Sequence, residues 1–478
     1  MTVRPAFRDP NVLRWLGAYT TSVTGDVAYF MALSWATVRV AGPAQVGAVL
    51  AVGALPRAVL MLGGGVLADR FGPRRVLIGS DLVRCGMLLG AAALTWAGGP
   101  QLWLLYALSV LFGVVDAVFI PAVGALPPRL TDQGQLARVQ GMRVLAVRFS
   151  NAVGPLVGAF ALAVVGAAGA FAVVGVLFGV SLGLLSAVRM RPVVAAPVAT
   201  ARADGEVELG PDRTDPPDQG EPPDQASPPD QASPPDQASP PDQASPPGWA
   251  DHLDPANPPG LLVEPPPHRR KAVEAISRRP LSADLRDGLR YLRGHRRLRG
   301  LVLAVALGEM CFSGPLAAGL VLLADERKWD AAVLGWILAA FSVGGAVSAL
   351  AMAAARRVPR AAPVLAGSLF VTAGLVTVLG RAATPGAAVV FGGLLGVVSG
   401  VAMVLGNALV QKEAEPRYLG RVTSVTSLGT LGLSPVLFPL AGLVAAAWGT
   451  GAFFTGCGAV CVLAAATALS RPLRGARL

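Results

Sequence analysis

Long apolar stretches recur along this 478-residue chain, and they restrict its fold more than any other feature. Each is about 20 residues or longer, enough for a helix to cross the ~30 Å hydrocarbon core of a bilayer. Lipid offers the backbone no hydrogen bonds, so a spanning segment must be a helix or part of a closed barrel. The alternation of barrel strands is missing, and only 14% of residues are charged. We therefore predict an all-α membrane protein and exclude an ordinary soluble one.

Twelve transmembrane helices fit the apolar stretches, six on each side of a long polar interval. This division predicts two pseudo-symmetric halves of six helices each. The predicted spans are 13–37, 46–68, 76–97, 102–126, 139–165, 170–189, 299–323, 331–354, 362–380, 386–410, 423–446 and 452–470.

The positive charges are unevenly shared between the loops of the two sides. One side holds many Lys and Arg residues, whereas the other holds only Arg39, Arg327, Lys328 and Arg381. Because cytoplasmic loops carry the excess of positive charge, both termini are predicted to be cytoplasmic. The same bias accounts for the net charge of +11, so we expect no nucleic-acid partner.

The polar interval divides the chain into 1–190, a six-helix N-terminal half, 191–297, a cytoplasmic linker, and 298–478, a six-helix C-terminal half. The linker carries Ser-Pro-Pro-Asp-Gln-Ala repeats, which cannot bury apolar area and predict a disordered, polyproline-like tether. A docking role for the repeats is the alternative. The linker's end is predicted to be a basic amphipathic helix on the inner membrane surface, or else a partner-binding helix. That helix would carry Leu281, Leu285, Arg286, Leu289, Arg290, Leu292 and Arg293.

A motif between the second and third predicted spans gives the family. It runs from Gly65 to Arg75 and contains the charge-bearing segment Ala68-Asp69-Arg70-Phe71-Gly72-Pro73-Arg74-Arg75. It closely resembles the G-x-L-A-D-R-x-G-[RK]-[RK] signature of the major facilitator superfamily, with Pro73 where a basic residue is usual. The resemblance implies that Asp69 latches the two halves in the outward-open state. Asp69 would do so at the start of the eleventh span near Thr423, with Arg74 as its partner.

The fifth predicted span carries a second motif, which consists of Gly141, Ser150, Gly154, Pro155, Gly158 and Ala159. Its spacing is similar to the G-x8-G-x3-G-P-x2-G-G pattern of antiporter-type facilitators, with Ser150 and Ala159 in place of two glycines. A generic packing face of small residues is the alternative. Segments at 80–84, 288–293 and 411–422 resemble the macrolide-efflux and enterobactin-exporter branch of the drug:proton antiporters.

Ionisable residues inside predicted spans are costly and therefore candidates for function. Asp26, Asp116 and Glu309 are the candidates for proton coupling, and Arg57 and Arg148 are available charge partners. The alternative for the two aspartates is a permanent ion pair with arginine. For Glu309 the alternatives are binding of a cationic substrate or of a broken backbone.

Two further features belong to the predicted spans. Asp81 and Arg84 are spaced to pair with each other in a structural role, and Asn407 is a candidate for the substrate cavity.

These features predict a secondary active transporter that works by alternating access, and specifically a proton-coupled exporter of amphipathic small molecules such as drugs, macrolides or siderophores. The alternatives are an importer or lipid transporter of the same fold, and a non-transporting scaffold or sensor that uses the Pro-rich linker. No phosphate-binding loop, nucleophile elbow or metal-ligand pattern occurs, so we expect neither an enzyme nor a cofactor nor a metal. We expect a monomer in the lipid bilayer of a bacterial cell membrane, with a small-molecule substrate and protons as partners.

Overall fold

The computed structural model describes residues 6–127, 130–131, 133–188, 290–310, 312, 315–354, 361–415, 418, 422 and 432–469. Within these residues every regular element is a helix. They belong to one unit of the chain, Met1–Val193 with Arg279–Leu478. The predicted tether, the start of the predicted amphipathic helix and the latch position near Thr423 lie outside the described residues.

The first helices are η1 (Ala6–Arg8), α1 (Pro10–Val40), α2 (Pro43–Phe71), α3 (Pro73–Gly98), α4 (Leu102–Ala125) and α5 (Gln133–Ser186). Proline at the first position starts α1, α2 and α3, where its missing N–H would have no helical partner in any case. Asp9 caps α1 by accepting a hydrogen bond of 2.8 Å from the Asn11 N–H. Gly72, with φ 82°, provides the turn from α2 into α3, a conformation that favours glycine.

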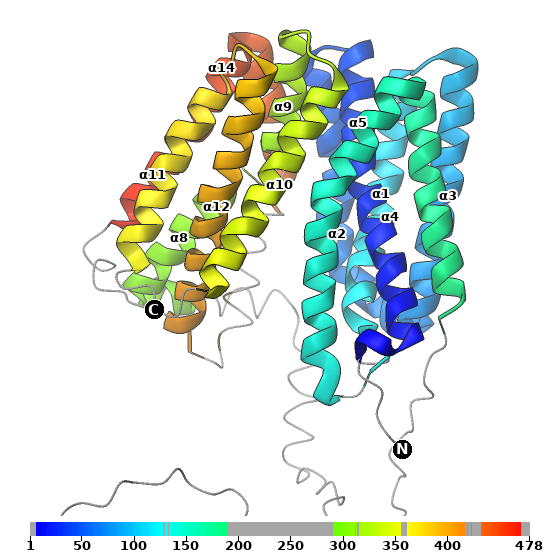
Figure 1. Ribbon diagram of the computed structural model, residues 1–478, viewed down its shortest axis with the longest axis horizontal. Helices are drawn as coiled ribbons and strands as arrows, with labels where there is room; N and C mark the ends of the chain where they lie inside the picture. The colour runs from blue at the N-terminus through cyan, green and yellow to red at the C-terminus, as the bar shows by residue number, and fades with distance from the viewer. Residues whose placement is uncertain are drawn as a thin grey trace, which may run out of the picture. The chain divides into compact units, whose positions relative to one another are not determined.

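The remaining helices are α8 (Arg296–Met310), α9 (Pro315–Glu326), α10 (Ala331–Ala354), α11 (Ala361–Leu379), α12 (Pro385–Glu413) and α14 (Ser434–Ala468). Gly166 in α5 and Gly449 in α14 have φ of 67° and 80°, so each of these long helices consists of two segments joined at a break. Both breaks fall between two predicted spans. Figure 1 shows α1 to α5 running alongside one another, and likewise α8 to α14.

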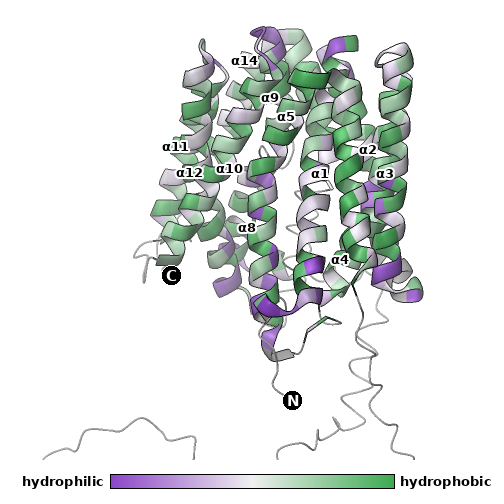
Figure 2. Cartoon of the chain, turned by 45° about the vertical axis from the view of Figure 1, so that its right-hand side comes forward, coloured by the Kyte–Doolittle hydropathy of each residue, from purple (hydrophilic) through white to green (hydrophobic). Residues whose placement is uncertain are grey.

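Eight of the described helices are long and apolar enough to cross a membrane, namely α2, α3, α4, α5, α10, α11, α12 and α14. Hydrophobic residues cover most of the helix length, and hydrophilic residues gather mainly at the helix ends (Figure 2). Large apolar side chains also face outward, including Phe160 and Leu350, which are 70% and 69% exposed. Such a surface suits lipid as the surrounding solvent. The total of twelve spans remains a prediction.

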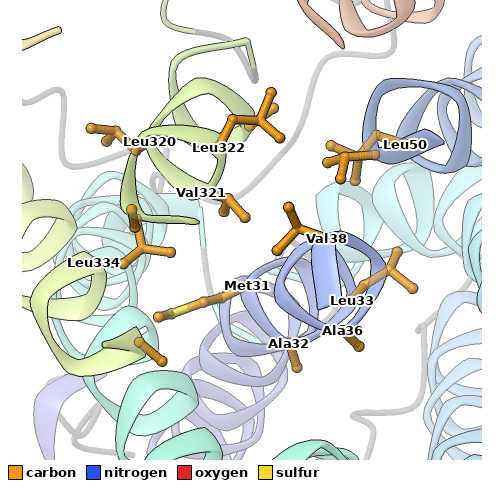
Figure 3. Packing of buried hydrophobic residues seen from close by; sticks show 14 of the residues in the cluster. Met31, Ala32, Leu33, Ala36, Val38, Leu50, Leu320, Val321, Leu322 and Leu334 are labelled. Atoms are coloured by element: carbon orange, nitrogen blue, oxygen red, sulfur yellow. The ribbon is translucent and has the colours of Figure 1, made fainter. Parts of the chain in front are cut away.

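Both halves contribute to packing at one end of the helices, which we call the outer end. This end contains the turn from α1 into α2 and the turn from α9 into α10. The breaks at Gly166 and Gly449 also lie at this end. A cluster of buried apolar residues there includes Met31 and Val38 of α1, Val321 of α9 and Leu334 of α10. In Figure 3, Met31 and Val38 point toward α9 and α10. Exposed Trp96, Trp103 and Trp448 mark the same end, as expected of an aromatic belt at a membrane interface.

Two further apolar clusters lie toward the opposite, inner end. One draws only on α1, α3, α4 and α5 and the residues that flank them. The other draws on the C-terminal half, and it includes Leu292 from the end of the predicted amphipathic helix. Residues 290–294 are helical, and Leu292 is buried against the protein itself. Among the described residues, therefore, a shared apolar cluster joins the halves at the outer end alone.

Candidate functional site: a buried charge cluster and two cavities

Arg84 of α3 lies at the centre of five charged side chains, which we call the buried charge cluster (Asp26, Arg57, Asp81, Arg84 and Asp116). The Arg84 side chain is fully buried and forms an ion pair and hydrogen bond with Asp116 of α4. Its other amino group, Nη1, lies 3.6 Å from Asp26 of α1 and 3.6 Å from Asp81, three residues earlier on α3. One guanidinium group thus holds acids from three helices together. A planar, permanently charged side chain with several donors is suited to this position.

Aromatic rings surround the same guanidinium. The Arg84 Cζ lies 4.1 Å from the ring centre of Phe119, 5.0 Å from that of Phe112 and 5.3 Å from that of Phe178. The ring faces attract a cation and exclude water. The free-energy cost of burying the Arg84 charge is therefore offset by the carboxylates and the aromatic faces together.

The three acids are held unequally. Asp81 accepts hydrogen bonds from Ser181 of α5 at 2.6 Å and from Ser22 of α1 at 3.2 Å, in addition to its ion pair. Asp116 contacts both Arg84 and, at 3.6 Å, Arg57 of α2. Asp26 has a single ion pair, and its Oδ1 has no hydrogen-bond partner among the described residues. Its side chain is 21% exposed, compared with 0% for Asp81 and 8% for Asp116.

The charges of this cluster do not balance. Among the described residues it holds three carboxyl groups and two guanidinium groups. With every group ionised the net charge would be −1, and a net charge in a low-dielectric interior is costly. A single proton on one carboxyl group would bring the cluster to neutrality. Asp26, with the fewest contacts and the most exposed carboxyl group, is the natural place for that proton.

The cluster meets a cavity through Arg57. This cavity, of about 460 Å³, is called the Arg57 cavity and lies between helices of the two halves. Its lining includes Val27 and Phe30 of α1, Arg57 of α2, Val321 of α9 and Phe438 of α14. Arg57 therefore contacts Asp116 on one side and borders open space on the other.

A second cavity of about 300 Å³ adjoins the first, since Asn151, Phe341 and Ser342 line both. We call it the Arg148–Glu309 cavity, after an arginine of α5 and a glutamate of α8 that line it. The Asn407 side chain of α12 hydrogen-bonds Glu309. The structure places Arg148 in this cavity and not in the buried charge cluster.

The fifth-span motif packs α5 against both halves. Ser150 donates a hydrogen bond of 3.0 Å to the Thr20 carbonyl of α1 and accepts one of 3.1 Å from the Thr24 hydroxyl. A Cβ atom on Gly154 would lie 2.7 Å from the Val27 Cβ, so only glycine allows this approach of α5 to α1. An added Cβ on Gly158 would lie 3.2 Å from the Ala28 carbonyl oxygen of α1, whereas one on Gly141 would meet no atom of the described residues within 4 Å.

Pro155 has a consequence of its own. Because proline lacks an N–H, the carbonyl of Asn151, four residues earlier, loses its helical donor. The Ser342 hydroxyl of α10 donates to this carbonyl at 2.7 Å, and it also lies 2.9 Å from the Leu338 carbonyl of its own helix. The proline thus creates a hydrogen-bond site that the opposite half uses.

The motif at 65–75 is described only in part. Gly65 and Asp69 lie in α2, but their side chains are outside the described part of the structure. Arg70 lies over the ring of Phe71, Arg74 donates to the Ser186 carbonyl at 2.7 Å, and Arg75 is exposed. The predicted pair of Asp69 with Arg74 therefore stays a prediction.

A family model described as Major Facilitator Superfamily matches residues 15–323 and 301–477 of the chain. The chain belongs to this superfamily. Multi-pass insertion in a membrane and a small-molecule substrate follow from membership and from the apolar helices. A search of curated proteins gave no match.

Solved structures of transporters resemble this facilitator in fold. The nucleoside transporter NupG matches with a TM-score of 0.60 at 11% identity, covering 96% of this chain and 98% of that one. The POT family transporter PepTSo matches with 0.59 at 12% identity, covering 96% of each chain. A bacterial homologue of the iron transporter ferroportin matches with 0.57 at 16% identity, covering 96% and 98%. At these identities the similarity establishes the fold alone.

Sequence spacing pairs Arg84 of this facilitator only with Asp81, whereas the structure gives it Asp26 and Asp116 as well. One signal was available. Arg84 lies well inside the predicted span 76–97, where a permanently charged group requires several partners. Which other helices supply those partners depends on packing, so the three-helix cluster was missed.

Proposed function

We propose that this facilitator is a proton-coupled exporter, an antiporter of amphipathic small molecules that works by alternating access. In this proposal both termini are cytoplasmic and twelve helices form two halves, with the breaks at Gly166 and Gly449 each separating two spans. The branch of macrolide and enterobactin exporters fits this function. The single observation that carries the proposal is the unbalanced charge cluster beside a cavity between the halves.

Asp26 is the proposed proton carrier. Its carboxylate gains the least from neighbours, so protonation there sacrifices fewer contacts than at Asp81 or Asp116. When Asp26 is neutral, Arg84 is shared by two carboxylates and can hold Asp81 and Asp116 more closely. Because Asp116 also contacts Arg57, a change in the cluster reaches the wall of the Arg57 cavity. Asp116 and Glu309 remain candidates of lower rank.

The packing of the halves is compatible with export. The shared apolar cluster closes the outer end, and the inner clusters belong to one half each. With cytoplasmic termini, a cavity between the halves would then load from the cytoplasm. Exchange of the bound molecule for an external proton would follow reorientation of the halves. The structural neighbours include proton dependent oligopeptide transporters, so the fold accommodates proton coupling in other proteins.

Replacement of Asp26 by Asn is expected to abolish proton movement driven by substrate, because an amide cannot exchange a proton. The measurement uses purified protein in liposomes that contain a pH-sensitive dye, with a substrate found by export assays across a compound panel. Asp330→Asn, an exposed acid in the loop before α10, is the matched control and should behave as wild type. Proton movement at the wild-type rate in Asp26→Asn would refute the assignment of Asp26, and the same result in Asp116→Asn would exclude both aspartates.

Deletion of residues 211–247 separates the transporter from the scaffold alternative. Those residues hold the whole Pro-rich repeat and lie outside the described residues. We expect export by the shortened chain to remain within about twofold of wild type at equal expression, since Pro-rich polar linkers act as spacers. Loss of export with normal membrane insertion would instead indicate that the repeat has a required partner.

A further inference from the structure

The Arg148–Glu309 cavity is built from five helices and is apolar over most of its wall. Leu365 and Leu369 of α11 and Met403 of α12 line it. The rings of Phe312 and Phe341 also line it and lie nearly parallel, with centroids 6.0 Å apart and an angle of 9° between the ring planes. A volume of about 300 Å³ is at the small end of the range for organic ligands. Parallel aromatic walls favour a flat ligand body.

Two opposite charges face this space without pairing. Among the described residues neither Arg148 nor Glu309 forms an ion pair, although both line the same cavity. The hydrogen bond from Asn407 to Glu309 adds a neutral donor and leaves the glutamate charge uncompensated. Charges in a membrane interior are expensive unless something compensates them. The arrangement therefore calls for a ligand with a group for each.

A third polar group points to the same conclusion. Thr372 of α11 lines the cavity with a relative exposure of 0%. Its hydroxyl has no hydrogen-bond partner among the described residues. Buried hydroxyl groups in native proteins are almost always bonded. A polar atom of a ligand would supply what Thr372 lacks.

We propose that the Arg148–Glu309 cavity binds a zwitterion with a flat apolar body, its anionic group on Arg148 and its cationic group on Glu309. This rests on the proposed transport function and specifies its substrate class. A carboxylate on the Arg148 guanidinium is a charge-assisted contact, as is an ammonium on the Glu309 carboxylate. The ligand body lies along Phe312 and Phe341. The cavity's net charge is zero with or without the zwitterion, so binding adds no uncompensated charge.

Norfloxacin is a suitable probe, because it is flat and fluorescent, with an amine and a carboxyl group at opposite ends. Its methyl ester keeps the cation, its N-acetyl derivative keeps the anion, and the doubly modified compound is neutral. Binding of all four to the full-length protein in detergent is measured by fluorescence anisotropy. For wild type we expect norfloxacin to bind at least about 10-fold more tightly than any derivative, since each charge-assisted contact contributes about that factor.

The variants give a crossed pattern. Arg148→Gln should weaken the binding of norfloxacin and of the N-acetyl derivative about 10-fold and leave the binding of the methyl ester unchanged. Glu309→Gln should weaken the binding of norfloxacin and of the methyl ester and leave the binding of the N-acetyl derivative unchanged. Arg143→Gln on α5 and Glu413→Gln at the end of α12 do not line the cavity and should match wild type. The neutral compound should bind all of these proteins alike, which reports an intact cavity.

Two results would overturn this proposal. One is a wild-type protein that does not prefer norfloxacin, whether it binds all four compounds equally or none. The other is an Arg148→Gln protein that binds all four compounds more weakly to the same degree, which would indicate a structural role for Arg148. Equilibrium binding in detergent needs no proton gradient, so Asp26→Asn should bind norfloxacin as wild type does. Failure of proton coupling and failure of the ligand class are therefore separate outcomes.

Discussion

Replacement of Arg84 by Gln is expected to lower the free energy of unfolding by about 3–5 kcal/mol, the usual cost of removing one partner of a buried ion pair. The variant leaves Asp26, Asp81 and Asp116 with Arg57 as the one remaining cation of the cluster described here. Gln also presents no cation to the rings of Phe112, Phe119 and Phe178, so that attraction is lost as well. Thermal unfolding of the detergent-purified protein measures the effect. Transport should be lost as well.

Three companion variants make the Arg84 result specific. Arg84→Lys keeps the charge but not the planar fork, and an intermediate loss of stability is expected. Arg84→Gln combined with Asp81→Asn and Asp116→Asn removes the surplus negative charge and should recover part of the stability. Arg381→Gln, at an exposed position, is the control. If Arg84→Gln unfolded at the wild-type temperature, the cluster would not be the electrostatic centre of this half.

Replacement of Gly442 by Leu is expected to open the outer end. A Cβ atom on Gly442 of α14 would lie 2.7 Å from the Pro43 carbonyl oxygen and 3.2 Å from the Gly47 Cα of α2. Overpacking at such a contact costs about 1–3 kcal/mol. Because this contact joins the two halves, separation of the halves relieves the strain. The closed outer end should therefore lose population by about 5–150-fold relative to the open one.

Spin labels on either side of the outer end measure this shift. With the four native cysteines replaced, labels at Val40 and Arg327 report the distance between α1 and the end of α9. We expect a longer distance in Gly442→Leu and slower transport. Gly90→Leu is the matched control, because Gly90 of α3 is exposed and has no atom within 4 Å of the added Cβ among the described residues. An unchanged distance in Gly442→Leu would show that the contact does not hold the end closed.

Several helices could be predicted from the sequence because the bilayer thickness and the backbone's hydrogen bonds fix their length. The structure begins α10 at Ala331 and ends it at Ala354, as predicted, and it breaks α5 at Gly166 between two predicted spans. The motif at 65–75 predicted the superfamily, which the family model confirms. Local sequence carries these signals.

The site could be predicted less well, since it depends on which helix faces meet. The sequence identifies the ionisable residues within spans, but it offers Arg57 and Arg148 as equivalent partners for Asp26 and Asp116. The structure brings Arg57 to Asp116 and places Arg148 in the cavity with Glu309. The pair of Asp81 and Arg84 was expected from spacing alone, while the contacts of Arg84 to α1 and α4 come from packing. The spacing of residues in the sequence predicts contacts within one helix but not contacts between neighbouring helices.

The hydrogen bond between Ser342 and the Asn151 carbonyl has a consequence for the speed of the transport cycle. The Ser342 hydroxyl already has the Leu338 carbonyl within 2.9 Å, so it keeps an acceptor when α10 leaves α5. Asn151 lines both cavities, so water can reach this region and take the place of the hydroxyl. The bond therefore fixes the register of α5 and α10, yet breaking it leaves neither the hydroxyl nor the carbonyl without a hydrogen-bond partner. Such a contact defines one resting position of the two helices and adds little to the energy barrier for leaving that position.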